Sequence, residues 1–128
     1  MPYEESMYPD DWYRIGEKEL KRARMLFDAG DLEGAGFNIQ QALEKYLKGW
    51  LLSKGWELKR IHDLETLLNE AIKYESSFEQ FRISCQKITQ YYIEERYPVT
   101  APSQLNEEEI GQSLSVAQKI IAKIKTAS

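Results

Sequence analysis

Apolar residues recur at three- and four-residue steps along most of the chain, which is the spacing of one face of an α-helix. The longest such stripe consists of Ala35, Ile39, Ala42, Leu43, Tyr46, Leu47, Trp50 and Leu51. Breaks between the stripes predict five helices, namely Asp11–Ala29, Leu32–Lys54, Asp63–Lys73, Ser77–Glu95 and a last one that follows Asn106. No alternating run of strand length is bounded by turn signals. The pattern therefore predicts an all-α fold, an up-and-down antiparallel bundle of four to five helices.

One such bundle accounts for the whole chain. At 128 residues the sequence has the length of one domain, and it contains no internal repeat and no linker. We therefore predict a single helical domain over residues 1–128, in which residues 1–10 form an N-terminal extension.

Residues with capping preferences stand at the predicted helix ends. Asp10 or Asp11 is the expected N-cap of the first helix, and Asp63 is the expected N-cap of the third. Gly30 ends the first helix as a C′ glycine, and Asp31 can cap the next helix directly. A link this short implies an antiparallel helical hairpin.

Two further local signals concern the second and the last helix. Gly34 and Gly36 cost the second helix up to about 1 kcal/mol each in propensity, and they can permit the close approach of a neighbouring helix. Asn106 followed by Glu109 resembles a capping box, with Asn at the cap. Both signals favour helices that pack closely and begin at defined residues.

Composition and charge narrow the class of protein. The net charge of −4 argues against broad electrostatic binding to nucleic acid, although a local basic patch is compatible with it. No apolar stretch has the length of a membrane span, and the acidic N-terminus does not resemble a secretory signal, so we expect a cytoplasmic protein with no membrane association. One cysteine, Cys85, and one histidine, His62, do not make a zinc site, and we expect no metal and no cofactor. We interpret Cys85 as a core residue because it lies in an apolar stripe.

The first group of candidate functional residues is Gln41, Glu44, Lys45 and Lys48, which share one side of the second predicted helix. Gln41 with Lys45 and Glu44 with Lys48 are spaced i,i+4, and the second pair has the favoured order for an ion pair. This face is either solvated, adding about 0.3–0.5 kcal/mol of helix stability, or a binding surface. We favour the solvated face.

The second candidate is His62, just before the start of the third helix. It is either a satisfied, partly buried histidine that fixes the loop or a group that titrates near physiological pH, and we favour the first interpretation.

The third candidate is Arg96 at the expected end of the fourth helix, where a cation is favoured by about 0.3–1 kcal/mol. Tyr91 and Tyr97 beside it can stack on a base or on a guanidinium, or Arg96 can instead pair with a carboxylate or the histidine loop. Both alternatives for Arg96 stay open.

Four segments, taken in order, resemble the HEPN family of small helical domains. They are Leu26-Phe27-Asp28-Ala29-Gly30-Asp31, the stretch from Phe37 to Lys48, His62-Asp63-Leu64, and Tyr92 with Glu95-Arg96-Tyr97-Pro98. The resemblance spans roughly residues 11–125. It implies a four- or five-helix bundle that is commonly a homodimer and is often encoded beside a minimal nucleotidyltransferase, as a two-component or toxin–antitoxin pair.

A large subset of that family are metal-independent ribonucleases with an arginine followed within a few residues by a histidine. This sequence departs from that motif, because no histidine follows Arg96 and His62 precedes it by 34 residues. Our leading hypothesis is therefore a non-catalytic binding module for a nucleotidyltransferase partner, a nucleotide or an RNA phosphate. In it Arg96 contacts phosphate, His62 orients it and Tyr92 or Tyr97 supplies stacking or hydroxyl contacts.

Two rival hypotheses remain. One is a degenerate ribonuclease that places His62 and Arg96 in one cleft, and the other is a purely structural polar network of Arg96, Glu44 and His62.

Dimerisation is a separate expectation, which comes from the composition. Three Trp, eight Tyr and four Phe exceed what a small bundle needs inside, so some aromatic surface is expected to meet another chain.

Overall fold

A computed structural model of the chain describes residues 6–96 and 105–127, with the backbone alone for residues 92–96. The described residues form helices and connecting segments with no strand, so the all-α prediction is confirmed. The elements are α1 (Pro9–Asp28), α2 (Leu32–Ser53), α3 (Leu64–Ile72), a 3₁₀ helix η2 (Ser76–Phe81), α4 (Arg82–Arg96) and α5 (Glu107–Thr126).

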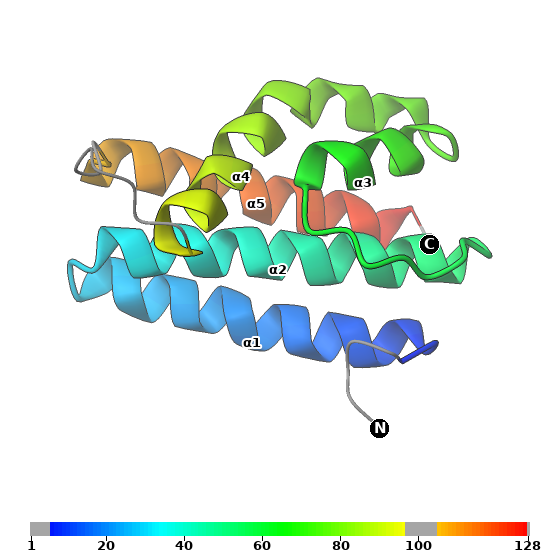
Figure 1. Cartoon of the computed structure of the whole chain (residues 1–128), viewed down its shortest axis with the longest axis horizontal. Coiled ribbons are helices and arrows are strands. Elements are labelled where there is room, and N and C mark those ends of the chain that lie inside the picture. The colour runs from blue at the N-terminus through cyan, green and yellow to red at the C-terminus, as the bar shows by residue number, and fades with distance from the viewer. Residues whose placement is uncertain (1–5, 97–104, 128) are drawn as a thin grey trace.

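Helices α1 and α2 run antiparallel, side by side, and are joined by a tight turn (Figure 1). Gly30 has a φ of 85°, a conformation that glycine adopts without steric cost. The Asp31 carboxylate then accepts a hydrogen bond of 2.9 Å from the backbone N–H of Gly34, which makes Asp31 the N-cap of α2. The hairpin, the C′ glycine Gly30 and the N-cap Asp31 are therefore as predicted from the sequence.

The start of α1 differs from the prediction. The N-cap is Tyr8, and Asp10 and Asp11 lie inside the first turn. The reason is Pro9, whose missing N–H and fixed φ suit the first helical position. Both carboxylates still lie at the positive end of the helix dipole, where they stabilise it.

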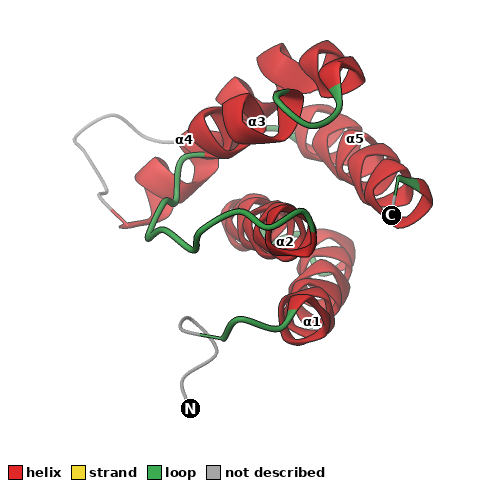
Figure 2. Cartoon of the chain, turned by 90° about the vertical axis from the view of Figure 1, so that its right-hand side faces the viewer, coloured by secondary structure: helices red, strands yellow, loops and turns green. Residues whose placement is uncertain are grey.

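Helix α2 occupies the middle of the molecule. Viewed end-on, α1, α5 and the pair α3 and α4 surround it (Figure 2). Its entire predicted apolar stripe is buried, from Ala35 to Leu51. The core therefore forms around α2, and residues on its other sides also meet protein instead of water.

Three glycines allow the helices to approach α2 closely. A Cβ at Gly16 would lie 2.7 Å from the ring of Tyr46, and one at Gly49 would lie 2.8 Å from the ring of Tyr13. A Cβ at Gly36 would lie 3.0 Å from the ring of Tyr91 on α4, which agrees with the predicted close approach. Gly34 does not have this role, because a Cβ there would meet the capping carboxylate of Asp31.

The second half of the chain adds a correction and a confirmation. The expected fourth helix is two elements, because residues 76–81 form a 3₁₀ turn that buries Phe78 and Phe81 before α4 begins. Cys85 is fully buried, and burial raises the pKa of its thiol to about 12, so its interpretation as a core residue is confirmed. Asp63 and Asn106 are the N-caps of α3 and α5, as predicted.

The aromatic residues are mostly accommodated inside the bundle. Among the aromatic side chains that the structure describes, Tyr8 and Tyr74 are the exposed ones, with exposed fractions of 69% and 47%. Most of the described aromatic side chains are therefore used inside the bundle, and the expected dimerisation stays a prediction. No described helix is long and apolar enough to cross a membrane.

The close approach of α1 and α2 at Gly16 gives a stability test. We expect Gly16→Ala to lower the free energy of unfolding by roughly 1 kcal/mol, because crowding the buried Tyr46 ring outweighs the gain in helix propensity. The control is Gly111→Ala in α5, whose Cβ would make an ordinary contact of 3.5 Å with Phe27 and should raise stability by up to about 1 kcal/mol. Urea denaturation measures both, and shifts of equal sign would contradict the packing argument.

Candidate functional site

A group of charged side chains is buried on α2, where the sequence favoured a solvated face. Glu44 is 1% exposed and Lys48 is 4% exposed, while the amide of Gln40 one turn earlier is fully buried. The solvated-face interpretation is therefore wrong, because α2 is enclosed and the segment 54–63 passes over this side of it. We name this group, with Lys45 and His62, the Glu44 cluster.

The Glu44 carboxylate is the centre of the cluster. Lys48 Nζ lies 3.0 Å from Glu44 Oε2, and Lys45 Nζ lies 3.4 Å from the same oxygen. His62 Nδ1 lies 3.1 Å from Oε1 and 3.2 Å from Oε2. Burial alone would raise the pKa of the Glu44 carboxyl, but the ammonium groups of Lys45 and Lys48, with His62, lower it below its ordinary value. Glu44 is thus ionised at neutral pH although it is buried.

His62 is held from two sides. Its backbone carbonyl accepts a hydrogen bond of 2.8 Å from Gln40 Nε2, and Glu44 contacts its ring through Nδ1. The next residues are also tied down, because Leu64 N donates to Thr89 Oγ1 on α4 at 3.2 Å. The side chain of His62 remains 56% exposed. In the neutral ring a carboxylate at Nδ1 selects the tautomer in which Nδ1 carries the proton and Nε2 is the acceptor.

The remaining predicted residues of α2 join the same network. Lys45 Nζ contacts Gln41 Oε1 at 3.3 Å, and Gln41 Nε2 donates to Gln40 Oε1 at 2.6 Å. The structure therefore brings together Gln41, Glu44, Lys45, Lys48 and His62, which the sequence had placed in two separate groups.

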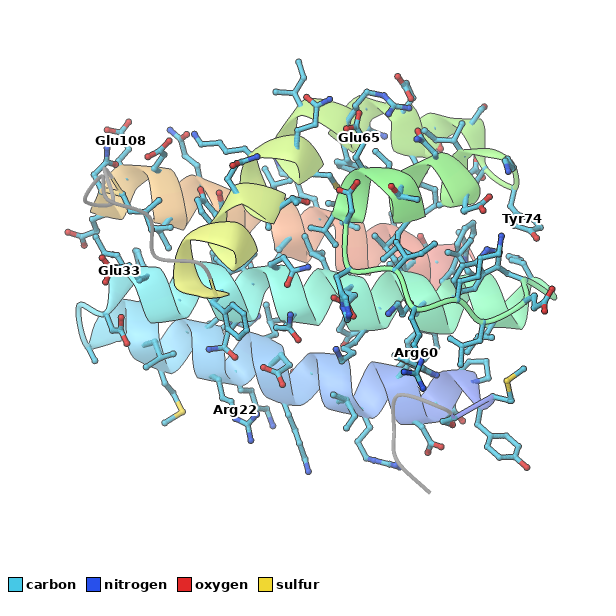
Figure 3. All side chains as sticks on the ribbon, in the orientation of Figure 1. Arg22, Glu33, Arg60, Glu65, Tyr74 and Glu108 are labelled. Atoms are coloured by element: carbon cyan, nitrogen blue, oxygen red, sulfur yellow. The ribbon has the colours of Figure 1, made fainter. Side chains whose placement is uncertain are left out.

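Two members of the network were missed from the sequence. Gln40 bridges Glu44 and the His62 carbonyl. Its i,i+4 spacing from Glu44 is the sequence signal by which it could have been found. The ring of Trp12 lies 5.5 Å from Lys48 Nζ, which adds a cation–π contact that no local pattern indicates. Arg60, two residues before His62, is exposed on the covering segment and brings a further cation to this side of the molecule (Figure 3).

The other predicted group lies at the end of α4. Helix α4 ends at Arg96, but the side chains of Tyr92 and Arg96, and all of Tyr97, lie outside the described residues. The expected meeting of His62 and Arg96 is outside them for the same reason. The backbone shows that the last turn of α4 and the segment before α3 lie on the same side of α2 (Figures 1 and 2).

The described residues contain no group of three or more His, Cys, Asp and Glu side chains that could hold a metal ion. The Glu44 cluster presents an imidazole oriented by a carboxylate, with ammonium groups beside it. Such a group can bind an anion by charge-assisted hydrogen bonds or transfer a proton.

Comparison with known proteins identifies similar sequences and folds. The sequence model of the HEPN domain matches residues 9–127. The solved structure of TT1696 from Thermus thermophilus is 28% identical over 92% of this chain and 96% of that one, with a TM-score of 0.82. The structure of ST0689, described as an archaeal HEPN homologue, is 26% identical over 94% of this chain and 97% of that one, with a TM-score of 0.76. No curated protein matches the chain.

The lowered pKa of Glu44 predicts how stability depends on pH. Because the folded-state pKa lies below the unfolded one, the contribution of Glu44 is complete above the ordinary value of 4.5 and is lost as the pH falls through the folded value. We expect Glu44→Gln to lower the free energy of unfolding at pH 7 by roughly 3 kcal/mol, because it leaves buried Lys48 without its carboxylate.

Denaturation of the wild-type protein and of Glu44→Gln between pH 7 and about pH 3 measures this, because the range extends below the ordinary pKa of a glutamate. The difference in stability between the wild-type protein and Glu44→Gln should shrink toward the acidic end. The matched control is Glu57→Gln at an exposed position, which should follow the wild-type curve. A difference that is constant with pH would contradict the assigned role of the Glu44 charge.

Proposed function

Because the chain belongs to the HEPN domain family, we propose that it is a homodimeric, non-catalytic binding module that takes a phosphate-bearing ligand, a nucleotide or RNA, beside the Glu44 cluster. The single observation that carries the proposal is the half-exposed imidazole of His62, which buried Glu44 orients between the protein interior and solvent. The two lysines beside it supply positive charge at the same place.

The burial of these charges supports a role beyond stability. Removing charged groups from water costs several kcal/mol per ion, and well-packed apolar residues in the same space are often as stable or more stable. This chain nevertheless buries Glu44 and Lys48 on its central helix, and it ties the loop that carries His62 to them. Charges in such a position, at the edge of the interior, are typical of a site that binds or reacts.

The proposed contacts follow from the chemistry of each group. His62 in its protonated form donates from Nε2 to a phosphate oxygen, and Lys45, which is 13% exposed, adds a point charge. Arg96 at the end of α4 contacts the phosphate, and Tyr92 or Tyr97 stacks on the base or donates a hydroxyl. The position of the last turn of α4, on the same side of α2 as the His62 segment, supports this part of the proposal.

The homodimer and the protein partner are proposed from the family. HEPN domains often dimerise. The resemblance to this family also implies a minimal nucleotidyltransferase encoded beside the protein. A binding module for a phosphate-bearing ligand is consistent with such a partner, because the partner handles nucleotides itself.

Isothermal titration calorimetry of the full chain with ATP and with a short single-stranded RNA tests the proposal. We expect His62→Ala to weaken binding roughly 10-fold or more, because a hydrogen bond to a charged group contributes about 1.5–3 kcal/mol. Arg96→Ala should have an effect of similar size. The matched controls are Asn69→Ala and Arg22→Ala, at exposed positions on α3 and α1.

Two results would contradict the proposal. Absence of heat with every ligand, together with a large loss of stability in His62→Ala, would leave a purely structural polar network. A sedimentation mass of one chain, 15.0 kDa, at micromolar concentration would contradict the homodimer.

A metal-independent ribonuclease is the second candidate function, and one observation favours it. In the contact between Glu44 and His62, a carboxylate holds one ring nitrogen while the ring reaches solvent. A general base is commonly oriented in this way, and its other nitrogen can accept the proton of an RNA 2′-hydroxyl.

Incubation with single-stranded RNA in the presence of EDTA tests this second function. Cleavage by the wild-type protein should fall about 10²–10⁴-fold in His62→Ala, the usual contribution of a general base. Asn69→Ala should cleave at the wild-type rate. Cleavage that persists unchanged in His62→Ala would mean that a contaminating nuclease is responsible.

A further inference from the structure

A hollow lies on the face of α2 opposite the Glu44 cluster, between α1 and the last turns of α5. Its volume is about 230 Å³, and Tyr13, Tyr46, Ile124 and Lys125 line it. Tyr46 lies two residues after Glu44, which is a rotation of about 200° around a helix. This tyrosine pocket is therefore separate from the Glu44 cluster, and nothing in the proposed function uses it.

Glycines on two helices make room for the rings of the pocket. Gly16 on α1 faces the Tyr46 ring, and Gly49 on α2 faces the Tyr13 ring, in both cases closer than a Cβ would allow. The two rings consequently stack across the helix pair, with centroids 5.7 Å apart and planes inclined by 26°. The rings are held by backbone geometry and not by side-chain contacts alone.

The tyrosine hydroxyls of the pocket have raised pKa values. The Tyr46 hydroxyl donates a hydrogen bond of 2.9 Å to Glu17 Oε2, and burial, followed by this bond, raises the pKa of Tyr46, which keeps the hydroxyl protonated. Burial likewise raises the pKa of Tyr13. Ile124 is 1% exposed and gives an apolar wall, whereas Lys125 is exposed at the edge, with its Nζ 5.9 Å from the centre of the Tyr46 ring.

The size of the pocket limits its ligand. A cavity of about 150 Å³ lined by apolar side chains binds benzene, whereas sites for drug-sized molecules start at about 300 Å³. A volume of about 230 Å³ lies between these and fits one ring or two fused rings. A flat ring continues the stack of the two tyrosines, because aromatic rings favour offset contacts with one another.

The charge at the edge of the tyrosine pocket further narrows the class of ligand. Among the described residues that line the pocket, Lys125 carries the charge, and it is positive. We propose that the tyrosine pocket is a binding site for a small aromatic carboxylate, whose ring lies against Tyr13, Tyr46 and Ile124 and whose carboxylate faces Lys125. This site binds its ligand independently of His62.

Titration of the full chain with indole-3-carboxylate, followed by NMR of the Ile124 methyl groups, tests the proposal. Indole lacks the carboxylate and cyclohexanecarboxylate lacks the aromatic ring, so the two serve as matched ligands. We expect indole-3-carboxylate to shift the Ile124 signals saturably and to bind more tightly than both. Lys125→Gln should weaken its binding about twofold to fivefold, the range for an exposed ion pair, and make it equal to indole. Lys119→Gln, at an exposed position of the same helix, should change nothing.

Tyr13→Leu should abolish saturable binding, and circular dichroism confirms that the variant is folded. If Tyr13→Leu does not fold, the exposed Lys125→Gln variant decides the question alone. His62→Ala should bind indole-3-carboxylate as the wild type does, which separates this site from the proposed phosphate site. Three results would overturn the proposal: no shift of Ile124 at the solubility limit, equal binding of cyclohexanecarboxylate, or unchanged binding in Lys125→Gln.

Discussion

The enclosure of α2 by the other helices governs both the core and the charged site of this protein. A helix at the edge of a bundle keeps one face in water, and its charged residues are solvated there at little cost. Helix α2 has protein around it over most of its length, so each polar residue on it must find a partner or lose its hydration. Glu44 meets this requirement by contacting two lysines, a histidine and a glutamine at once.

The same contacts connect the fold to the site. The segment that covers Glu44 is fixed through its backbone, because Gln40 holds the His62 carbonyl and Thr89 holds the N–H of Leu64. The network that satisfies buried polar atoms therefore also sets the position and the tautomer of His62. Because one set of contacts serves both purposes, a substitution in the Glu44 cluster changes the stability of the fold and the position of His62 together.

Close packing of α1 against α2 has a consequence on the other face. Without a Cβ at Gly16 and Gly49, the two backbones approach and the rings of Tyr46 and Tyr13 lie over each other's helices. The hollow beside these rings then exists because α5 ends near them, with Ile124 and Lys125 at its edge. One central helix thus separates a polar, charged cluster from a mainly aromatic hollow.

The helices and the fold class could be predicted from the sequence, because they depend on local interactions. The apolar stripe from Ala35 to Leu51, the N-caps Asp31, Asp63 and Asn106, and the positive φ of Gly30 involve residues within one or two turns of each other. The resemblance to the HEPN family likewise agrees with the match over residues 9–127. The start of α1 was missed because the preference of Pro9 for the first helical turn exceeded the capping preference of the aspartates.

Which polar face is buried depends instead on how the helices assemble. Gln41, Glu44, Lys45 and Lys48 have the local pattern of a solvated face, and nothing within α2 distinguishes the two cases. Burial depends on the segment between α2 and α3, which turns back over this face when the bundle closes. The contact of Lys48 with Trp12, and the pocket beside Tyr13 and Tyr46, likewise join residues from different helices. Helical periodicity does not predict such contacts. It indicates the face of the helix on which a residue lies, and not which residue of another element packs against that face.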